Sequence, residues 1–463
     1  MGKGHKISRI SLMFAGAFWL VGAAFSQIVD QNTNVAPEVL DPILELEREL
    51  EERQRQEERE QFRPPALQGE DINPDALPEV SIGPCLHVLD VEVDGVTLLD
   101  QSIIDQQIDG IVPGCLDQSR ISILMQRLNK VYADRGYITT RVYIPEQDVA
   151  ATSTLRLVAL EGVIEEIELV DVKRDEPISG VRRRLLLGTA YPHKTPRLFQ
   201  LRDLEQAIDQ LSRPSSVNAV LRLEPGEQPG GSRIVIQRRV QDRLRLFAEV
   251  NNTGAVSTGQ RQARISFAGD SILRANDTWF VTYQGGNNSN ALSVSSSLPY
   301  GYNTFTAFAS YSDFFIPLTD FSELFGRTVS YGTGWSRLLR RSATKRRILS
   351  LNLQGRQSAR FVNAVELVPQ DLATVDIRLS NIVDTDKARW SWDLGPVAGL
   401  PVFNDPEITE ETGPDIPQNN FVALRGGFTR IGKGRDGLFR WTSSVRFQAA
   451  SRALFGSEQI AFG

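Results

Sequence analysis

The side chains that most often carry catalysis are few in this chain and lie far apart. Its three histidines are His5 near the N-terminus, His87 close to a cysteine, and His193 in a proline-flanked loop. No nucleophile-elbow motif, glycine-rich phosphate loop or set of metal ligands at a recognised spacing accompanies them. The sequence therefore predicts a protein that is not an enzyme and that uses no cofactor, no metal and no small-molecule substrate.

Residues 1–26 have the pattern of a signal peptide. A basic start precedes an apolar run over 10–25, and the small residues Ala24 and Ser26 predict cleavage before Gln27. The alternative is an N-terminal membrane anchor, but the run is short for a span. Cleavage would take the formal net charge from −6 to −9, because three cationic residues are lost. No basic run remains, so we exclude nucleic acid as a partner.

The two cysteines, Cys85 and Cys115, are candidates for a disulfide. Their spacing excludes a Cys-x-x-Cys redox motif, and no histidine cluster suggests zinc. A secretory signal and an even cysteine count favour a disulfide, whereas two free buried thiols are the alternative. Closing a loop of about 30 residues would stabilise the fold by about 3–4 kcal/mol in the chain-entropy model.

The C-terminal region, 242–463, has an alternating apolar and polar pattern. Val375 and Ile377, for example, alternate with Asp376 and Arg378. A period of two with charged residues on the polar face indicates strands with lipid on one side and water on the other, as in an antiparallel transmembrane β-barrel. A soluble β-sandwich is the alternative. The mean hydropathy of −0.22 excludes a bundle of membrane helices but not a barrel. The eleven strand-like segments lie near 243–250, 260–268, 277–285, 290–298, 303–312, 326–339, 345–361, 366–383, 388–399, 420–431 and 438–450.

Two α+β modules precede this region, at 82–162 and 163–241. Both have the order β-α-α-β-β. In the first we expect strands at 86–93, 137–144 and 154–161 and helices at 98–109 and 118–135. In the second we expect strands at 164–172, 217–223 and 233–240 and helices at 176–187 and 200–212. A repeat of about 77 residues is a repeat of whole small domains rather than a solenoid.

Two further segments lie between the signal and the modules. Residues 38–61 have high helix propensity but become polar on every side after Leu50. Such a helix must lie in water, as a spacer, or in the polar lumen of a barrel. Residues 62–81 hold four prolines and are expected to be a linker.

Several local motifs, taken in order, resemble one known family. Tyr132–Arg141 reads YADRGYITTR, and Leu201–Ala207 reads LRDLEQA. The glycine-rich segment 225–232 and the Asn-Thr-Gly segment 251–259 also fit. Together with the element order, the chain resembles the TpsB outer-membrane transporters of two-partner secretion, the haemolysin/haemagglutinin secretion family. In this family the modules are POTRA domains.

The resemblance also implies a departure at the C-terminal end. The family signature is a Val-Arg-Gly-[Phe/Tyr] tip on a long loop, and residues 454–463 resemble the approach to it. The family barrel has sixteen strands and barrels of this kind have an even number. We therefore expect 242–463 to be a partial barrel with about 11 of 16 strands.

The resemblance implies three roles: capture of an unfolded exoprotein of the TpsA type, conduction through a polar lumen, and a helix over 38–61 that closes the pore. Exposed edge strands can bind an unfolded chain by adding it as a further strand. The middle strand of each module is expected at an edge, which indicates 138–144 and, better, 217–223, with helix 200–212 as a groove wall. The expected client-binding residues are Val217, Ala219, Leu221, Leu223, Arg202 and Gln206. The expected pore-lining residues are Arg245, Arg264, Asn352, Arg356, Arg378 and Arg446.

The expected location is the bacterial outer membrane, in contact with its lipid, with the POTRA domains in the periplasm. Two other functions stay open. The chain could be an assembly factor that inserts barrels into the outer membrane, although two POTRA domains and an N-terminal helix favour secretion. It could also be a soluble periplasmic scaffold or adhesin if the β region were a sandwich.

Overall fold

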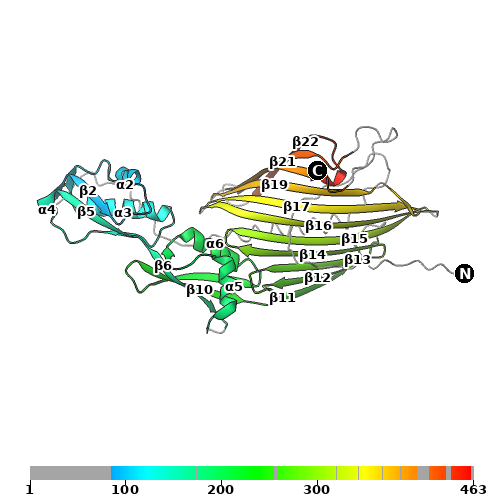
Figure 1. The fold of residues 1–463 in the computed structure, drawn as a ribbon, viewed down its shortest axis with the longest axis horizontal. Helices are drawn as coiled ribbons and strands as arrows, with labels where there is room; N and C mark the ends of the chain where they lie inside the picture. The colour runs from blue at the N-terminus through cyan, green and yellow to red at the C-terminus, as the bar shows by residue number, and fades with distance from the viewer. Residues whose placement is uncertain are drawn as a thin grey trace.

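The computed structural model describes residues 85–173, 176–254, 259–319, 321–342, 344–367, 369–385, 388–403, 417–433 and 439–459. The predicted signal peptide at 1–26, helix at 38–61 and linker at 62–81 lie outside the described residues. Figure 1 shows two small α+β modules in a row, followed by a large sheet whose strands begin beside the second module. No helix of the described residues is long and apolar enough to cross a membrane.

The first module packs two helices against a three-stranded sheet of order β2-β5-β4, beside a two-stranded sheet β1-β3. Helix α3 buries Leu124, Leu128 and Tyr132 at helical spacing, and the Asp117 side chain caps its first turn. A disulfide joins Cys85 to Cys115, as predicted. The elements are β1 (Leu86–Val88), β2 (Asp90–Asp94), α2 (Gln101–Ile108), β3 (Gly114–Leu116), α3 (Gln118–Asp134), β4 (Arg141–Tyr143), α4 (Val149–Thr152) and β5 (Thr154–Leu160).

The second module has a sheet of order β7-β6-β10-β9, so β9 is an edge strand, as the sequence predicts for 217–223. Helix α6 buries Leu204, Ala207 and Leu211 in the module core. The helix predicted from residue 176 begins at Gly180, because Glu176 and Pro177 instead extend the sheet beside β6. The elements are β6 (Val163–Asp171), β7 (Glu176–Pro177), α5 (Gly180–Ala190), β8 (Arg197–Leu198), α6 (Leu201–Leu211), β9 (Val217–Pro225) and β10 (Gly231–Val240).

The large sheet is an antiparallel series of neighbours in chain order from β11 to β22, with β18 as a short addition to β17. The eleven predicted strands are all present. β11 and β22 stand at the two ends of the order, so the described sheet is an unclosed barrel. The strands are β11 (Leu244–Asn251), β12 (Gln262–Asp270), β13 (Thr278–Gly286), β14 (Ser289–Tyr300), β15 (Asn303–Thr319), β16 (Ser322–Arg341), β17 (Lys345–Val362), β18 (Val365–Glu366), β19 (Gln370–Asp384), β20 (Ala388–Leu400), β21 (Val422–Lys433) and β22 (Arg440–Ala450).

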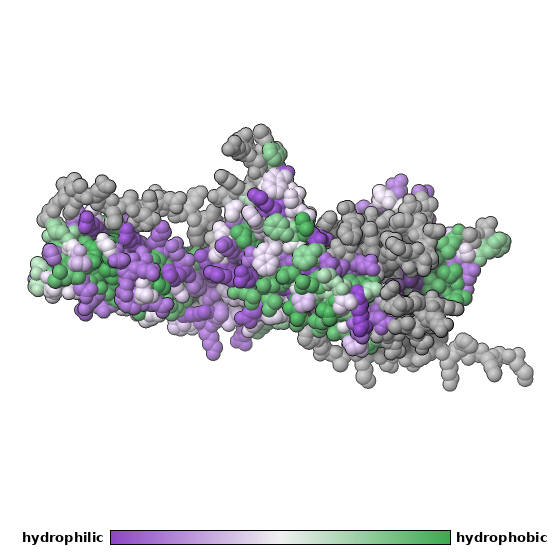
Figure 2. Space-filling model, turned by 90° about the horizontal axis from the view of Figure 1, so that it is seen from above, coloured by the Kyte–Doolittle hydropathy of each residue, from purple (hydrophilic) through white to green (hydrophobic). Residues whose placement is uncertain are grey.

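The two faces of the large sheet differ in polarity. Alternate side chains on one face are apolar and exposed, as at Ile265, Tyr283 and Leu292. Residues between them on the other face are polar and buried, as at Ser266 and Gln284. Figure 2 shows hydrophobic residues gathered over the large sheet. An apolar outer face around a polar inner face is the arrangement of a membrane barrel, not of a sandwich.

Candidate functional site: the second module, its edge strand and the adjoining sheet

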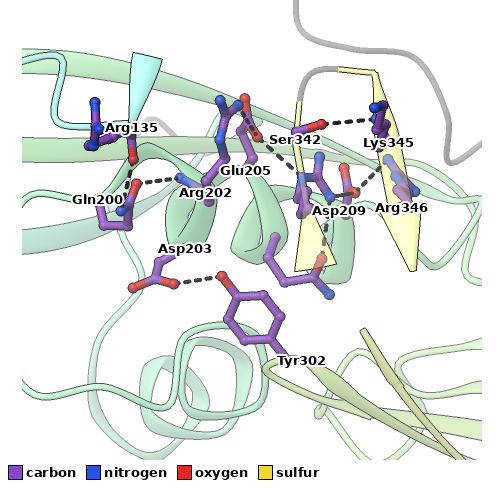
Figure 3. A network of polar contacts seen from close by, with 12 residues as sticks. Arg135, Gln200, Arg202, Asp203, Glu205, Asp209, Tyr302, Ser342, Lys345 and Arg346 are labelled. Carbon is purple, nitrogen blue, oxygen red and sulfur yellow. Dashed lines mark hydrogen bonds and ion pairs between the residues drawn. The ribbon is translucent and has the colours of Figure 1, made fainter. Parts of the chain in front are cut away.

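Helix α6 lies against one end of the large sheet, which we call the module end. Strands β12, β14 and β16 finish there, and β11, β13, β15 and β17 begin there, because the strands alternate in direction. One side of α6 carries polar residues that are nevertheless buried, namely Asp203, Gln206 and Gln210. Buried polar groups require hydrogen-bond partners. The large sheet supplies those partners (Figure 3).

The connection between β14 and β15 accepts two hydrogen bonds from α6. Gln206 and Gln210 both donate from Nε2 to the Gly301 carbonyl oxygen, at 3.1 Å and 2.8 Å. Gly301 has a φ of +56°, which favours glycine at this turn. The neighbouring Tyr302 hydroxyl donates to Asp203 at 2.6 Å (Figure 3). Burial and this contact raise the pKa of Tyr302, so its hydroxyl stays protonated and remains a donor.

The connection between β16 and β17 supplies two arginines. Arg341 is 5% exposed, and it donates from Nε to Glu205 at 3.2 Å and forms an ion pair with Asp209. Arg346 reaches the same Asp209 carboxylate at 3.2 Å. Arg341 also donates to the Gln206 side-chain oxygen at 3.2 Å. We call these contacts between α6 and strand ends β14–β17 the docking network.

A second set of contacts joins the module to β11–β13. Asn276 is fully buried and donates to the Leu186 carbonyl oxygen in α5 at 2.8 Å. The buried Asp270 carboxylate accepts from the Ser216 N–H at 2.9 Å and from Arg245 at 2.8 Å. The second module is therefore fixed to the large sheet by polar contacts on two of its sides.

These contacts change the interpretation of two predicted client-binding residues. The Gln206 side chain is 6% exposed and bonded to the sheet at both its nitrogen and its oxygen. Gln206 could therefore contact a client only after its bonds to the sheet are released, and client contact at this residue stays a prediction. Arg202 forms an ion pair with Glu205 at 3.5 Å and is 22% exposed, so client contact at this residue stays a prediction.

The edge of β9 is closed in its first half. The Val217 N–H donates to the Pro214 carbonyl oxygen at 2.8 Å, and the Ala219 N–H donates to the Ser212 hydroxyl at 3.1 Å. Both donors point away from β10, the neighbour to which β9 is paired. The first half of the strand therefore has no main-chain donor to offer at its edge.

The second half of β9 is open. Main-chain groups alternate between the two sides of a strand, so Leu221 and Leu223 direct their N–H and C=O groups to the same side as Ala219. Neither has an N–H bond outside its own strand pair among the described residues. The strand is exposed from Arg222 to Pro225, and Leu223 is 45% exposed. A further strand could therefore pair with β9 around Leu221 and Leu223.

The edge strand of the first module is less suited to pairing. β4 has three residues, and its Val142 N–H donates to the Asn129 side chain at 2.9 Å. That N–H points away from β5, the strand paired with β4, so the Asn129 side chain occupies the outward donor of this edge. The longer, partly open β9 is therefore the better candidate for strand addition, and client binding at either edge stays a prediction.

Polar side chains line the inner face of the large sheet in small bonded groups. Arg264 donates to Gln284 at 2.9 Å and 3.1 Å. Arg378 donates to Asp376 at 2.7 Å and lies 3.4 Å from Asp393. Asn352 lies opposite Asp376 in the adjoining strand. Pore lining by these residues stays a prediction.

The other three predicted pore residues differ in position. Arg245 bonds Ser215 of the second module at 2.7 Å, so it lies at the junction rather than along the lumen. Arg446 is exposed on β22, the last strand of the order, opposite Gly427. Arg356 lies in β17 opposite Ser330 and Leu372, on the same face as Asn352.

The segment after β22 folds back against the inner face. Leu454 and Phe455 pack with Val397, Phe421 and Ala423. The following short helix η2 (Gly456–Glu458) brings Glu458 within 2.8 Å of Arg425. Alternation does not predict this contact; the one signal for it in the sequence is that Leu454 and Phe455 are an apolar pair outside any alternating strand. Among the described residues, no group of acidic, histidine or cysteine side chains could hold a metal ion.

Comparisons with known proteins give a consistent picture. Residues 230–463 match the family described as haemolysin secretion/activation protein ShlB/FhaC/HecB, and residues 86–162 match the ShlB-type POTRA domain. The chain is 26% identical to the outer membrane transporter CdiB of Dickeya dadantii (strain 3937) in an alignment of 412 residues that covers 82% of this chain and 68% of that protein. It is 32% identical to the hemolysin transporter protein ShlB of Serratia marcescens over 247 residues, which are 52% of this chain and 41% of that protein.

Solved structures share the fold. CdiB from Escherichia coli superposes with a TM-score of 0.79 at 22% identity, covering 92% of this chain and 79% of that one. CdiB from Acinetobacter baumannii gives a TM-score of 0.64 at 16% identity, covering 94% and 80%.

Proposed function

This chain belongs to the haemolysin secretion/activation family of ShlB, FhaC and HecB, and from this premise we propose that it captures an unfolded exoprotein in the periplasm and conducts it across the outer membrane. The protein is an outer-membrane protein with periplasmic POTRA domains. The observation that carries the proposal is the open half of β9 on a module docked at the mouth of a polar-lined sheet.

Capture is proposed to occur by strand addition. Main-chain hydrogen bonds do not depend on side-chain identity, so the edge at Leu221 and Leu223 suits an unfolded client of varied sequence. The half-buried Leu221 and exposed Leu223 alternate with Val220 and Arg222, which gives the added strand two distinct faces to contact.

Docking is proposed to direct the captured chain into the lumen. The network around Arg341 and Asp209 holds the module at the module end of the sheet, and the polar inner face starts there. A client chain that leaves β9 would therefore pass along the polar side chains of the inner face. Its main-chain groups need hydrogen-bond partners throughout the passage, and these side chains could supply them. Arg264 and Arg378 are proposed to contribute to that path.

The segment 38–61 is proposed to close the pore until a client arrives. A helix is about 10–12 Å wide, so its removal should raise the single-channel conductance in planar bilayers. A variant lacking 38–61 tests this directly. Unchanged conductance would instead make the segment a periplasmic spacer.

The partner is proposed to be a large secreted exoprotein of the TpsA type. The test is deletion of this gene in its own host, with measurement of the exoprotein encoded beside it. We expect that exoprotein to disappear from the medium and to return when the gene is restored. Unchanged secretion would contradict the proposal. A general loss of other barrels from the outer membrane would instead indicate an assembly factor.

A further inference from the structure

Arg430 lies on the apolar outer face of the large sheet, between aromatic side chains of two neighbouring strands. Arg430 in β21 is opposite Trp390 in β20, and both alternate with inward residues such as Thr429 and Ser391. Its guanidinium carbon lies 4.7 Å from the centre of the Trp390 ring and 4.9 Å from that of Trp441 in β22. The charge is therefore flanked by an indole from the strand on either side. Cation–π contacts of this kind hold a guanidinium in one orientation.

Within the part of the chain that the structure describes, no carboxylate is paired with this guanidinium. Among the described residues, Arg430 forms no ion pair, and its solvent-shielded Nε donates no hydrogen bond. Arg378 and Arg389, by contrast, are paired with carboxylates on the inner face. A charge on a lipid-facing surface without a partner is costly unless the surroundings supply one.

The position along the strand indicates what the surroundings are. Arg430 lies close to the end of β21, and Trp390 and Trp441 lie close to the beginnings of β20 and β22, all at the module end. Trp279 and Trp335 also lie on the outer face towards this end. A ring of tryptophans marks the level of lipid headgroups in membrane barrels.

We propose that Arg430, Trp390 and Trp441 form a binding site for the phosphate of a glycerophospholipid in the membrane leaflet that faces the periplasm. The guanidinium would donate to the phosphate oxygens while the indoles hold it in place and contact the upper part of the acyl chains. The site rests on the proposed placement of the outer face in lipid. The proposed site would bind one lipid headgroup on β20, β21 and β22, the last three strands of the described sheet.

The test compares lipid retention by the full chain and by two variants. The purified protein is exchanged into mild detergent with dioleoyl phosphatidylglycerol or with dioleoylglycerol, which has the same chains but no phosphate, and retained lipid is counted by native mass spectrometry. We expect Arg430→Ala to lower phosphatidylglycerol retention about tenfold, the value of one charge-assisted hydrogen-bond site. The matched control is Arg347→Ala, an exposed arginine at the module end of β17, which should change retention little.

Several results would overturn the site. Equal retention by the Arg430→Ala variant and the unaltered protein would do so, as would equal retention of dioleoylglycerol and phosphatidylglycerol. Loss of the Arg430-dependent difference on adding inorganic phosphate would show a site for free anions rather than for lipid. An unaltered protein that retains no lipid and is absent from the outer-membrane fraction would count against the proposed function itself, so the two failures are distinguishable.

Discussion

Helix α6 and strand β9 are neighbours in the second module, and the sequence predicts both as client-binding surfaces. In the structure, the polar side of α6 is buried and the second half of β9 is exposed. Polar residues of α6 are buried against the large sheet, where Gln206 and Gln210 share the Gly301 carbonyl oxygen. The second half of β9, around Leu223, is exposed and pairs with no strand but β10 among the residues that the structure describes. The contrast shows that a polar helix face is not necessarily a free face. It also separates two tasks, docking by α6 and capture by β9.

Breaking the docking side should have the largest effect. Arg341→Ala removes the buried cation that Glu205 and Asp209 share. Asp209 keeps Arg346 and Glu205 keeps Arg202, and loss of one partner of a buried ion pair costs up to about 3–5 kcal/mol. We expect a broader distribution of distances between spin labels on the second module and on the large sheet. Arg156→Ala is the control, because its ion pair with Asp94 is exposed and should contribute about 1 kcal/mol or less. An unchanged distance distribution in Arg341→Ala would contradict the docking role.

Opening the first module would show whether its own edge contributes to capture. Replacing Cys85 and Cys115 by serine removes the disulfide and should destabilise this module by about 3–4 kcal/mol, measured by its susceptibility to protease in the full-length protein. β4 is short and its Val142 N–H is bonded to Asn129, so we expect this edge to contribute little to capture. Export of the exoprotein should therefore fall much less than it does in a β9 variant. Loss of export equal to that of a β9 variant would place capture in both modules.

Replacing a buried arginine in β10, the strand next to β9, should stabilise the second module, whereas the two preceding changes should destabilise the protein. Arg238 in β10 is fully buried and its guanidinium has no hydrogen-bond partner among the described residues, and burial lowers its pKa to about 10. The folded state thus disfavours the charge, and this penalty is fully present below about pH 10 and declines as the pH rises above that value. Arg238→Leu should therefore stabilise the second module by about 1–3 kcal/mol at neutral pH.

The measurement is the thermal midpoint of protease protection of the second module at pH 7 and pH 11. The stabilising effect of Arg238→Leu should be smaller at the higher pH. Arg239→Leu, at the exposed neighbouring position, should leave the midpoint nearly unchanged. A lower midpoint for Arg238→Leu would show that the charge has a stabilising partner.

The smallest change in stability is expected for a substitution in the open half of β9, where export of the exoprotein should nevertheless fall. Leu223→Pro removes one outward N–H that is not used in pairing with β10, and one hydrogen bond contributes about 0.5–1.5 kcal/mol. Export should fall about tenfold while the module stays folded. Leu223→Ala keeps the N–H and should export more than Leu223→Pro. Arg222→Pro should instead disrupt the β9–β10 pair. Normal export by Leu223→Pro would exclude strand addition here.

Much of the architecture could be predicted from the sequence, because the patterns are local. The apolar spacing of Leu204, Ala207 and Leu211 predicts α6, and the alternation around Val375 and Ile377 predicts β19. The edge position of β9 follows from the order of elements in the module. These predictions depend on residues close together in the chain.

The parts that could not be predicted depend on contacts between distant residues. Gln206 and Gly301 are 95 positions apart, and nothing near either residue indicates the other. The Ser212 hydroxyl closes half of β9, although the strand pattern alone suggests that Ala219 and Leu221 are equally available. Leu454 and Phe455 contact the inner face through a chain reversal that periodicity does not reveal.

The central claim is that the client pairs with β9 near Leu223 and not with α6. A photo-reactive benzophenone amino acid placed at Leu223 or at Arg202 in the full-length protein tests this in cells that export the neighbouring exoprotein. We predict a covalent adduct with the exoprotein from position 223 that is clearly stronger than any adduct from position 202. An adduct from position 202 with none from position 223 would contradict the account and move capture to the helix.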